Sequence, residues 1–417
     1  MSLEWKSCKI GDLGKIFSGG TPSTKIKEYW DGDLNWLSSG ETRNTYIYTT
    51  DKFITEEGAN NSSTKLANKG DIVIASAGQG FTRGQSSMVM IDTYVNQSVI
   101  VISPNDKVNN HYLLYNLKFR YPELRQLSDH ASTRGSLTTK IIKGLDINLP
   151  DLNTQNKIAT IIQYFDKKIE TNKRINKNLE QLIKHIYINW FEEFEPFKDL
   201  NFYDTKLGRI PVGWEVVPLQ KFIKFQEGPG IRNWQYVEED GVNFLNIRCI
   251  QNNDLSLDTA NMISKEEASG KYAHFMLNEW DLVISSSGTL GRYAIVRNEH
   301  LPVCLNTSII RFSPLHSFNH YAYVYSYLTS RGFYHYLLTM GSGSVQLNFG
   351  PTHLKQIDLI VPPENILKKY NDLIFPLIEQ MVTIKSEISK LTKLRDTLLP
   401  KLMSGEIDVS KINCDLE

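Results

Sequence analysis

Few residues of this sequence have the types and spacing needed for catalysis. Pro150-Asp151, followed by Asp166 and Lys168, has the composition of a metal-dependent nuclease site, in which carboxylates hold a divalent cation and a lysine stabilises hydroxide. Such a site needs its later residues on a strand, whereas Asp166 and Lys168 lie inside a heptad pattern. His316 and His320 have the i,i+4 spacing of a metal-binding helical face, but a helix-terminal role is favoured over a zinc site.

Other catalytic patterns are missing from the sequence. It contains no G-x-x-x-x-G-K-[ST] phosphate loop, no G-x-S-x-G and no H-E-x-x-H. Cys8, Cys249, Cys304 and Cys414 are too far apart for a zinc knuckle and favour reduced thiols in a cytoplasmic protein. No apolar run approaches the roughly 18 residues of a membrane span. We therefore expect a cytoplasmic, non-catalytic chain that holds no metal and no cofactor.

The net charge is zero, with 46 basic and 46 acidic residues. Nucleic-acid binding would therefore depend on local patches or on a partner. Polar loops punctuated by glycine offer such patches, because Arg, Gln, Asn, Ser and Thr read base edges or hold phosphates. Taken singly, each loop is more typical of a solvated turn, but eight such loops at matching places in two copies of a domain favour a binding role. The candidate DNA-contact residues are Thr21, Ser23, Lys25, Arg43, Asn44, Gln79, Arg83, Gln85 and Arg134, then Arg232, Asn233, Gln251, Asn252, Arg292, Ser344 and Gln346.

The two halves of the chain repeat each other. Residues 71–78 recur as 281–288, and residues 96–104 recur as 306–314, both at a shift of 210. The β-branched runs in these segments predict strands, and segments such as Tyr112 to Phe119 predict helices. A repeat of this length indicates a duplicated mixed α/β domain and not a solenoid, whose repeats span about 20 to 50 residues.

A long helix is predicted after each domain, because apolar residues recur with alternating spacings of four and three. Asn172 and Asn176 fall in the first seam, where polar residues fix the register at some cost in stability. The two helices are expected to pair antiparallel, although two amphipathic helices packed on their own domains would show a similar pattern. The seam residues are Ile158, Phe165, Ile169, Asn172, Leu179 and Ile183 in the first helix, and Leu377, Ile384, Leu391 and Leu398 in the second.

These patterns together predict the organisation of the chain. The expected segments are a first domain at 1–150, a spacer helix at 151–191, an acidic linker at 192–209, a second domain at 210–363, a second spacer helix at 364–404 and a tail at 405–417. The fold class is mixed α/β, with two duplicated globular domains separated by an antiparallel coiled coil and related by a pseudo-twofold.

The sequence resembles the specificity subunits of type I restriction-modification systems over essentially its full length. The resemblance rests on Ser18-Gly-Gly-Thr-Pro-Ser23, on Ile210 to Leu219, on the repeated strand motifs and most specifically on Leu398 to Ile407. One departure is Gly228-Pro-Gly230, which stands where the first half has Gly20-Thr-Pro-Ser23, so the role of that motif does not carry over.

The resemblance implies two target-recognition domains, each reading half of a bipartite site in double-stranded DNA. It also implies spacer helices that act as a ruler and bind two modification (methyltransferase) subunits, with restriction (motor-nuclease) subunits joining them. S-adenosylmethionine, ATP and Mg²⁺ would then belong to those partners. A helix of about 35 residues spans about 50 Å, enough to separate two domains by one DNA turn of about 34 to 36 Å. Two alternatives stay open, namely a DNA-independent protein-interaction scaffold and a self-contained metal-dependent nuclease.

Overall fold

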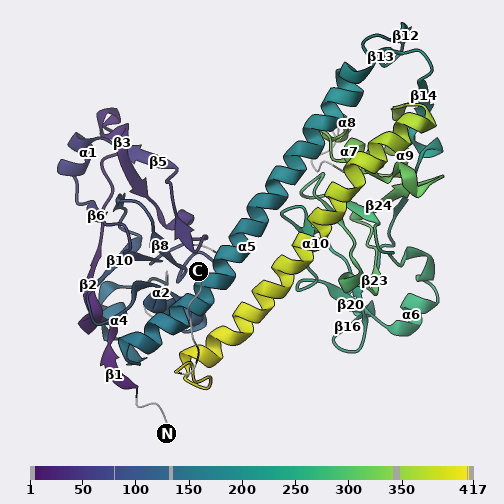
Figure 1. Cartoon of the computed structure of the whole chain (residues 1–417). Helices are drawn as coiled ribbons and strands as arrows, with labels where there is room; N and C mark the ends of the chain where they lie inside the picture. The colour runs from purple at the N-terminus through teal and green to yellow at the C-terminus, as the bar shows by residue number, and fades with distance from the viewer. Residues whose placement is uncertain (1–4, 79, 131–134, 341–347, 411, 413–417) are drawn as a thin grey trace. The chain divides into compact units, whose positions relative to one another are not determined.

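A computed structural model describes residues 5–78, 80–130, 135–340, 348–410 and 412 (Figure 1). The chain divides into two compact units. The first unit comprises Met1–Ile169 and Leu391–Glu417, and the second comprises Glu170–Lys390. Each unit therefore contains one globular domain and a part of both long helices.

A mostly antiparallel sheet forms the centre of the first unit. Its strands lie in the order β2 (Gly14–Ser18), β10 (Val99–Pro104), β7 (Ile72–Ala75), β8 (Ser86–Val89) and β4 (Tyr46–Ile47). The predicted β-branched runs are β7 and β10, and β7 is buried along its whole length, as a strand covered on both faces should be.

Shorter elements complete the first domain. A second sheet has the order β5 (Lys52–Ile54), β3 (Trp30–Leu37), β9 (Thr93–Val95) and β6 (Lys65–Ala67), and β1 (Lys6–Lys9) pairs with β11 (Asp146–Leu149). The helices are α1 (Glu56–Asn60), α2 (Asn110–Phe119), α3 (Tyr121–His130) and α4 (Thr139–Gly144). Asn109 caps the start of the buried helix α2, because its side chain accepts the N–H of Tyr112 (3.0 Å).

The second unit repeats this design, as the duplication predicts. Its central sheet has the order β15 (Ile223–Glu227), β24 (Ile309–Pro314), β21 (Leu282–Ser285) and β22 (Tyr293–Ile295). The other paired strands are β16 (Tyr236–Val237), β20 (Asn261–Ile263), β17 (Val242–Phe244) and β23 (Val303–Cys304), together with β14 (Glu215–Pro218), β25 (Asp358–Val361), β18 (Ile250–Gln251) and β19 (Asp254–Leu255). The helices of this domain are α6 (Lys265–Ser269), α7 (Tyr321–Leu328), α8 (Arg331–Met340) and α9 (Pro351–Leu354).

The repeated sequence motifs mark the turns that open these strands. Asn96 and Asn306 each accept the backbone N–H two residues further on, at 2.9 and 2.8 Å, which bends the chain into β10 and β24. Asp71 and Asp281 accept the N–H of the residue three positions earlier, at 2.9 and 2.8 Å. Burial raises the pKa of both carboxyl groups. The motif residues are therefore structural.

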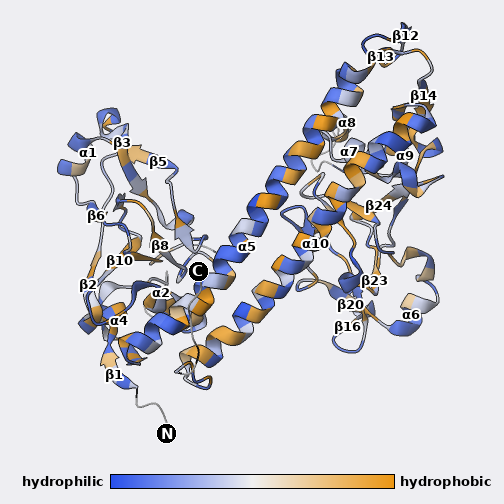
Figure 2. Ribbon diagram, in the orientation of Figure 1, coloured by the Kyte–Doolittle hydropathy of each residue, from blue (hydrophilic) through white to orange (hydrophobic). Residues whose placement is uncertain are grey.

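The two long helices are α5 (Leu152–Tyr187) and α10 (Glu364–Met403), and apolar residues recur as patches along both (Figure 2). In the second unit Asn172 donates to Glu387 (2.9 Å), and further along α5 Glu180 faces Lys385 (3.7 Å). As the residue number on α5 rises from 172 to 180, the number of the contacting residue on α10 falls from 387 to 385. The predicted antiparallel pairing is therefore confirmed.

The helices also pack on the domains, so both of the arrangements weighed from the sequence are present at once. Ile158 belongs to the core of the first unit, and Ile183 belongs to the core of the second. Ile158, Ile169, Asn172, Ile183 and Ile384 are buried, whereas Phe165, Leu179, Leu377, Leu391 and Leu398 are half-buried. Beside Leu377, Ile378 is fully buried.

The acidic segment after α5 contains ordered structure. A π-helix runs from Ile188 to Glu192, and β12 (Phe202–Thr205) forms a hairpin with β13 (Gly208–Pro211). Phe197 and Trp214 join the core of the second unit, with ring centroids 5.1 Å apart. The segment is therefore anchored to this unit through its aromatic residues.

Candidate nucleic-acid interface

The polar loops of the first unit leave from one edge of its sheets. β2 and β7 both end beside the start of β10, since Ser18 pairs with Ile100 and Ala75 pairs with Val99. Just before β10, the N–H of Asn96 donates to the carbonyl at the end of β3 (3.1 Å). Strands that end at a common edge bring their following loops together. The loops at this edge are residues 18–25, 38–44 and 76–85.

The predicted contact residues of the first unit differ in how available their side chains are. Four of them are exposed, the Thr21 hydroxyl is hydrogen-bonded to the side chain of Gln97, and Gln85 is half-buried. Two more, Gln79 and Arg134, lie outside the described residues. The exposed four are Ser23, Lys25, Arg43 and Asn44.

Arg83 supports its loop from within. Its guanidinium donates to the Gly135 carbonyl (2.9 Å) and forms an ion pair with Asp129, and only 12% of its side chain is exposed. The positive charge is therefore used inside the unit, and an alanine at this position would change the shape of the loop. The sequence does not show this role, because Asp129 and Gly135 lie far along the chain.

Two further side chains of α3 hold the same loop. The Tyr121 hydroxyl donates to the Phe81 carbonyl (3.0 Å), and Arg125 donates to the Gly80 carbonyl (2.8 Å). The Phe81 side chain itself is 83% exposed. The loop thus presents an aromatic ring on a fixed backbone, which sequence reasoning based on polar residues missed.

The second unit gathers its loops in the same way. β15 and β21 end beside the start of β24, since Glu227 pairs with Ile310 and Ser285 pairs with Ile309. The loop after β17 begins at the same place, because Leu245 donates to the carbonyl at the end of β23 (3.0 Å). The loops at this edge are residues 228–235, 245–253 and 286–292.

Arg232, Asn233, Gln251, Asn252 and Arg292 are all exposed in these loops. Their supports differ. The Gln251 side chain donates to a carbonyl of its own loop (2.7 Å), and Arg292 reaches the carbonyl of Ile250 (3.4 Å), so two loops are joined. Asn252 adopts a positive φ of 52°, as a tight hairpin turn requires.

Ser344 and Gln346 lie outside the described residues. Exposed Arg248 lies at the start of the loop that carries Gln251 and was not predicted as a contact.

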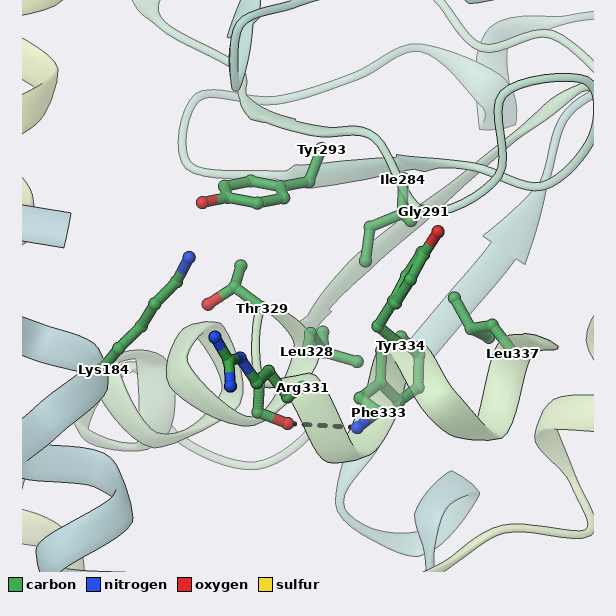
Figure 3. A pocket seen from close by; sticks show the side chains of 11 residues that line it. Lys184, Ile284, Gly291, Tyr293, Leu328, Thr329, Arg331, Phe333, Tyr334 and Leu337 are labelled. Atoms are coloured by element: carbon green, nitrogen blue, oxygen red, sulfur yellow. Dashed lines mark hydrogen bonds between the residues drawn. The ribbon is translucent and has the colours of Figure 1, made fainter. Parts of the chain in front are cut away.

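A pocket of about 210 Å³ lies beside the loop 286–292 (Figure 3). Lys184 of α5 and Arg331 at the start of α8 both line it, together with Tyr293 and Tyr334. Gly291 has a φ of 77°, and a Cβ there would meet the Tyr334 ring at 2.7 Å, so only glycine fits without strain. The two cationic side chains give this pocket a positive lining. It could not be predicted from the sequence, because Lys184 and Arg331 are far apart in the chain.

Two of the nuclease-like residues, Asp151 and Asp166, have structural partners. Asp151 accepts the N–H of Thr154 (3.0 Å) at the start of α5, and hydrogen bonds from Thr154 lower the pKa of its carboxyl group. Asp166 is bound to Arg395 and Tyr115, each at 2.8 Å. Within the described residues there is no group of three side chains suited to a metal ion. The described helices include none that is apolar and long enough to cross a membrane.

His320 has a structural role. Its Nε2 lies 2.8 Å from the Glu364 carboxylate, and its ring stacks on Phe222 with centroids 4.9 Å apart. His316 contacts the Lys221 carbonyl (2.7 Å) through its own Nε2. The two imidazoles thus have separate protein partners, in keeping with the helix-terminal role favoured from the sequence.

Comparisons with known proteins agree with this duplicated arrangement. The family model described as the type I restriction modification DNA specificity domain matches residues 2–181 and again 211–393. The type I restriction enzyme MjaIX specificity subunit of Methanocaldococcus jannaschii is 32% identical over 434 aligned positions, covering 98% of this chain and 95% of that one. The HindI specificity subunit of Haemophilus influenzae is 22% identical and covers 97% of this chain and 100% of its own.

Among solved structures, the type I restriction-modification S subunit of M. genitalium has a similar fold. The TM-score is 0.60 at 18% sequence identity, and 96% of each chain is covered. The likeness therefore extends over both units.

Proposed function

Because the chain belongs to the family defined by the type I restriction modification DNA specificity domain, we propose that it reads a bipartite site in double-stranded DNA for a type I restriction-modification complex. The observation that carries this proposal is the duplicated sheet edge, which gathers three polar loops in each unit. Both units expose arginine and asparagine there, and these side chains recognise guanine and adenine edges in the major groove. Each unit would read one half of the site.

Differences between the two sets of loops support separate half-sites. The first unit offers Arg43 and Asn44 after β3, whereas the second offers Gln251 and Asn252 at the corresponding place. In the central sheets beneath these loops, the strands β2, β10, β7 and β8 of the first unit follow the same order as β15, β24, β21 and β22 of the second. A shared scaffold with different loop residues suits two readers of different sequence.

In our proposal the chemistry belongs to partner subunits. Two modification subunits would bind the helix pair and transfer a methyl group from S-adenosylmethionine to adenine, and ATP-dependent restriction subunits requiring Mg²⁺ would join them. This chain would be a non-catalytic subunit acting in the cytoplasm. Its zero net charge supports the idea that partners supply much of the binding to DNA phosphates.

The test is modified-base sequencing of DNA from cells that express this chain with its neighbouring methyltransferase. Cells that lack only this chain provide the comparison. We expect a bipartite motif with methylated adenine that disappears when the chain is removed. An unchanged methylation pattern, with both proteins expressed and assembled, would contradict the proposal and favour a DNA-independent scaffold.

A further inference from the structure

An ion pair joins α5 to α10 within each unit. In the first unit Asp166 lies 2.8 Å from Arg395, and in the second Glu180 lies 3.7 Å from Lys385. The side chains are largely buried, with exposures of 7% and 23% in the first pair and of 17% and 11% in the second. Removing charged groups from water costs free energy unless further hydrogen bonds compensate for it. We therefore asked which neighbouring groups bind to each pair.

In the first unit, hydrogen bonds lead from the ion pair to a candidate recognition loop. The Tyr115 hydroxyl of α2 donates to Asp166 (2.8 Å) and lies 2.8 Å from the Tyr46 hydroxyl. The Tyr46 hydroxyl keeps its proton at neutral pH, and burial raises its pKa further, to about 12. Tyr46 begins β4, directly after the loop that carries Arg43 and Asn44. The ion pair thus holds the strand on which this loop ends.

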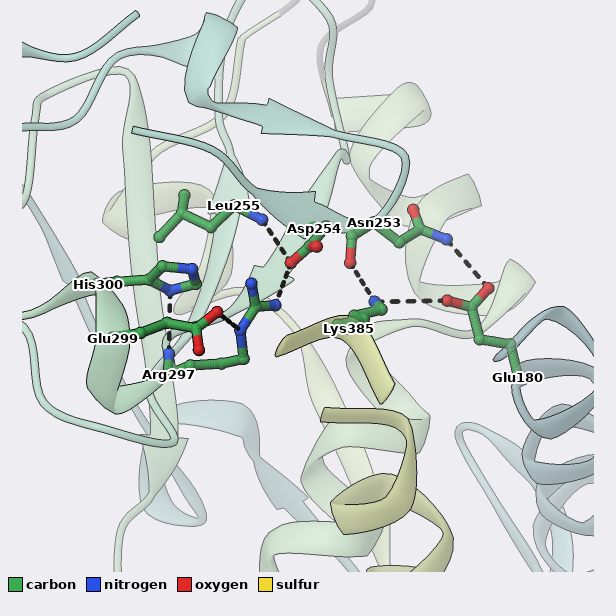
Figure 4. Close-up of polar contacts among 8 residues, drawn as sticks. All are labelled: Glu180, Asn253, Asp254, Leu255, Arg297, Glu299, His300 and Lys385. Atoms are coloured by element: carbon green, nitrogen blue, oxygen red, sulfur yellow. Dashed lines mark hydrogen bonds and ion pairs between the residues drawn. The ribbon is translucent and has the colours of Figure 1, made fainter. Parts of the chain in front are cut away.

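In the second unit, the ion pair binds a recognition loop directly (Figure 4). The ammonium group of Lys385 donates to the Asn253 carbonyl, while the Asn253 side chain donates to Glu180 (3.2 Å). Next to it, Asp254 forms an ion pair with Arg297, whose side chain is only 5% exposed. The hairpin of β18 and β19 is therefore fastened to both helices at its tip.

The two arrangements hold corresponding parts of the repeat. Tyr46 and Asp254 are related by a shift of 208 residues, which is also the shift that relates Asn35 to Asn243. The connecting contacts differ between the units. In the first unit two tyrosine hydroxyls link the ion pair to the strand, whereas in the second the ion pair contacts a backbone carbonyl directly. Two different sets of contacts thus fasten the end of the recognition loop, where it meets the next strand, to an ion pair of the helices.

We propose that these two ion pairs are positioning devices for DNA reading. Each pair fixes the end of the recognition loop, where it meets the next strand, against the helices of its own unit, so the loop residues meet the bases at a set place. This inference rests on the proposed function. It assigns Lys385 and Glu180 to the second half-site, and Arg395 and Asp166 to the first, although none of these residues needs to touch DNA.

The test uses the assembled complex with its methyltransferase and a library of random duplexes. We choose the double variant Glu180→Met/Lys385→Met, because replacing both partners leaves no unpaired charge in the interior. Discrimination among bases of the second half-site should fall about tenfold, within the range that one mismatched pair produces. The first half-site should be selected as before. Lys369→Met, on an exposed part of α10, is the matched control and should select the same motif as the wild type.

The reciprocal variant Asp166→Met/Arg395→Met should affect only the first half-site. Equal loss in both half-sites would mean general destabilisation and would overturn the positioning role, as would an unchanged motif. The charge-swapped variant Glu180→Lys/Lys385→Glu loses the ammonium donor to the Asn253 carbonyl, so it should restore the helix pair without restoring full discrimination. If the wild-type complex itself selects no motif, the proposed function fails, and that outcome is distinct from failure of the positioning role.

Discussion

Replacing Asp166 by asparagine tests whether this residue is a structural ion-pair partner or a catalytic carboxylate. The substitution keeps the shape of the side chain and removes the charge that faces Arg395 at 2.8 Å. Breaking a buried pair costs about 3 to 5 kcal/mol. Arg395 is 23% exposed and is also bound to Asp396 at 2.8 Å, so it keeps one partner and the expected cost falls to about 2 kcal/mol.

Thermal unfolding followed by circular dichroism should show this loss directly. For a unit of this size, 1 kcal/mol corresponds to about 2 to 4 °C, so Tm should fall by about 4 to 8 °C. Asp396→Asn is the matched control, because this carboxylate is 58% exposed, and it should cost below about 0.5 kcal/mol. In a double-mutant cycle with Arg395→Met we expect a coupling energy of about 1.5 kcal/mol.

A coupling energy below about 0.5 kcal/mol would refute the buried pair. Incubation of the purified chain with duplex DNA and Mg²⁺ separates the two roles. If wild-type protein cuts DNA and Asp166→Asn does not, the carboxylate is catalytic and the structural assignment is wrong. We expect no cutting by either protein.

Three further predictions concern the second unit. Arg292→Ala should weaken the free energy of DNA binding by about 1 to 3 kcal/mol and relax base selection at one position of one half-site, as measured in competition assays. An equal loss of base selection in both half-sites would argue against separate readers. Ile183→Lys places a charge where exposure is 1%, so it should disrupt the helix pair, and normal capture of the methyltransferase in a pull-down would contradict this. Burial, assisted by the charge of Arg297, lowers the pKa of His300 to about 4 from an ordinary value of 6.5, so stability should be lost as the pH falls from 6.5 towards 4. The loss should approach about 3 kcal/mol in urea titrations and should be smaller in His300→Asn; equal pH profiles would rule out this titration.

The elements that depend on local patterns were predictable from the sequence. Asn96 and Asn306 precede strands because their side chains bind the next turn of backbone, and such a motif is visible in a few residues. The heptads that contain Ile158 and Ile183 also predicted the long helices, because a heptad repeat is likewise a local pattern that can be read along the chain. The duplication supports the prediction made for each copy, since both copies must form the same fold.

What could not be predicted depends on contacts between distant residues. Arg83 has the residue type of a base reader, yet its charge is used by Asp129, a partner that no spacing rule identifies. Lys184 lies on a spacer helix and still lines a pocket beside a recognition loop. Acidic residues around Phe197 suggested a linker, whereas the aromatic side chain decides the packing of that segment. Burial and pairing energies act through three-dimensional neighbours, which a linear reading does not contain.

The chain segments that make up each unit determine the order in which the units can be completed during synthesis. The second unit is one continuous stretch, Glu170–Lys390, whereas the first also requires Leu391–Glu417. Leu402 and Met403 are buried in the core of the first unit, and Lys157 donates to the Ser410 carbonyl (2.7 Å). The ribosome makes these residues after the whole second unit, so the domain translated first is the one completed last. Until then the apolar side chains that pack against Leu402 and Met403 lack this cover, as in the partly folded states from which larger proteins can aggregate.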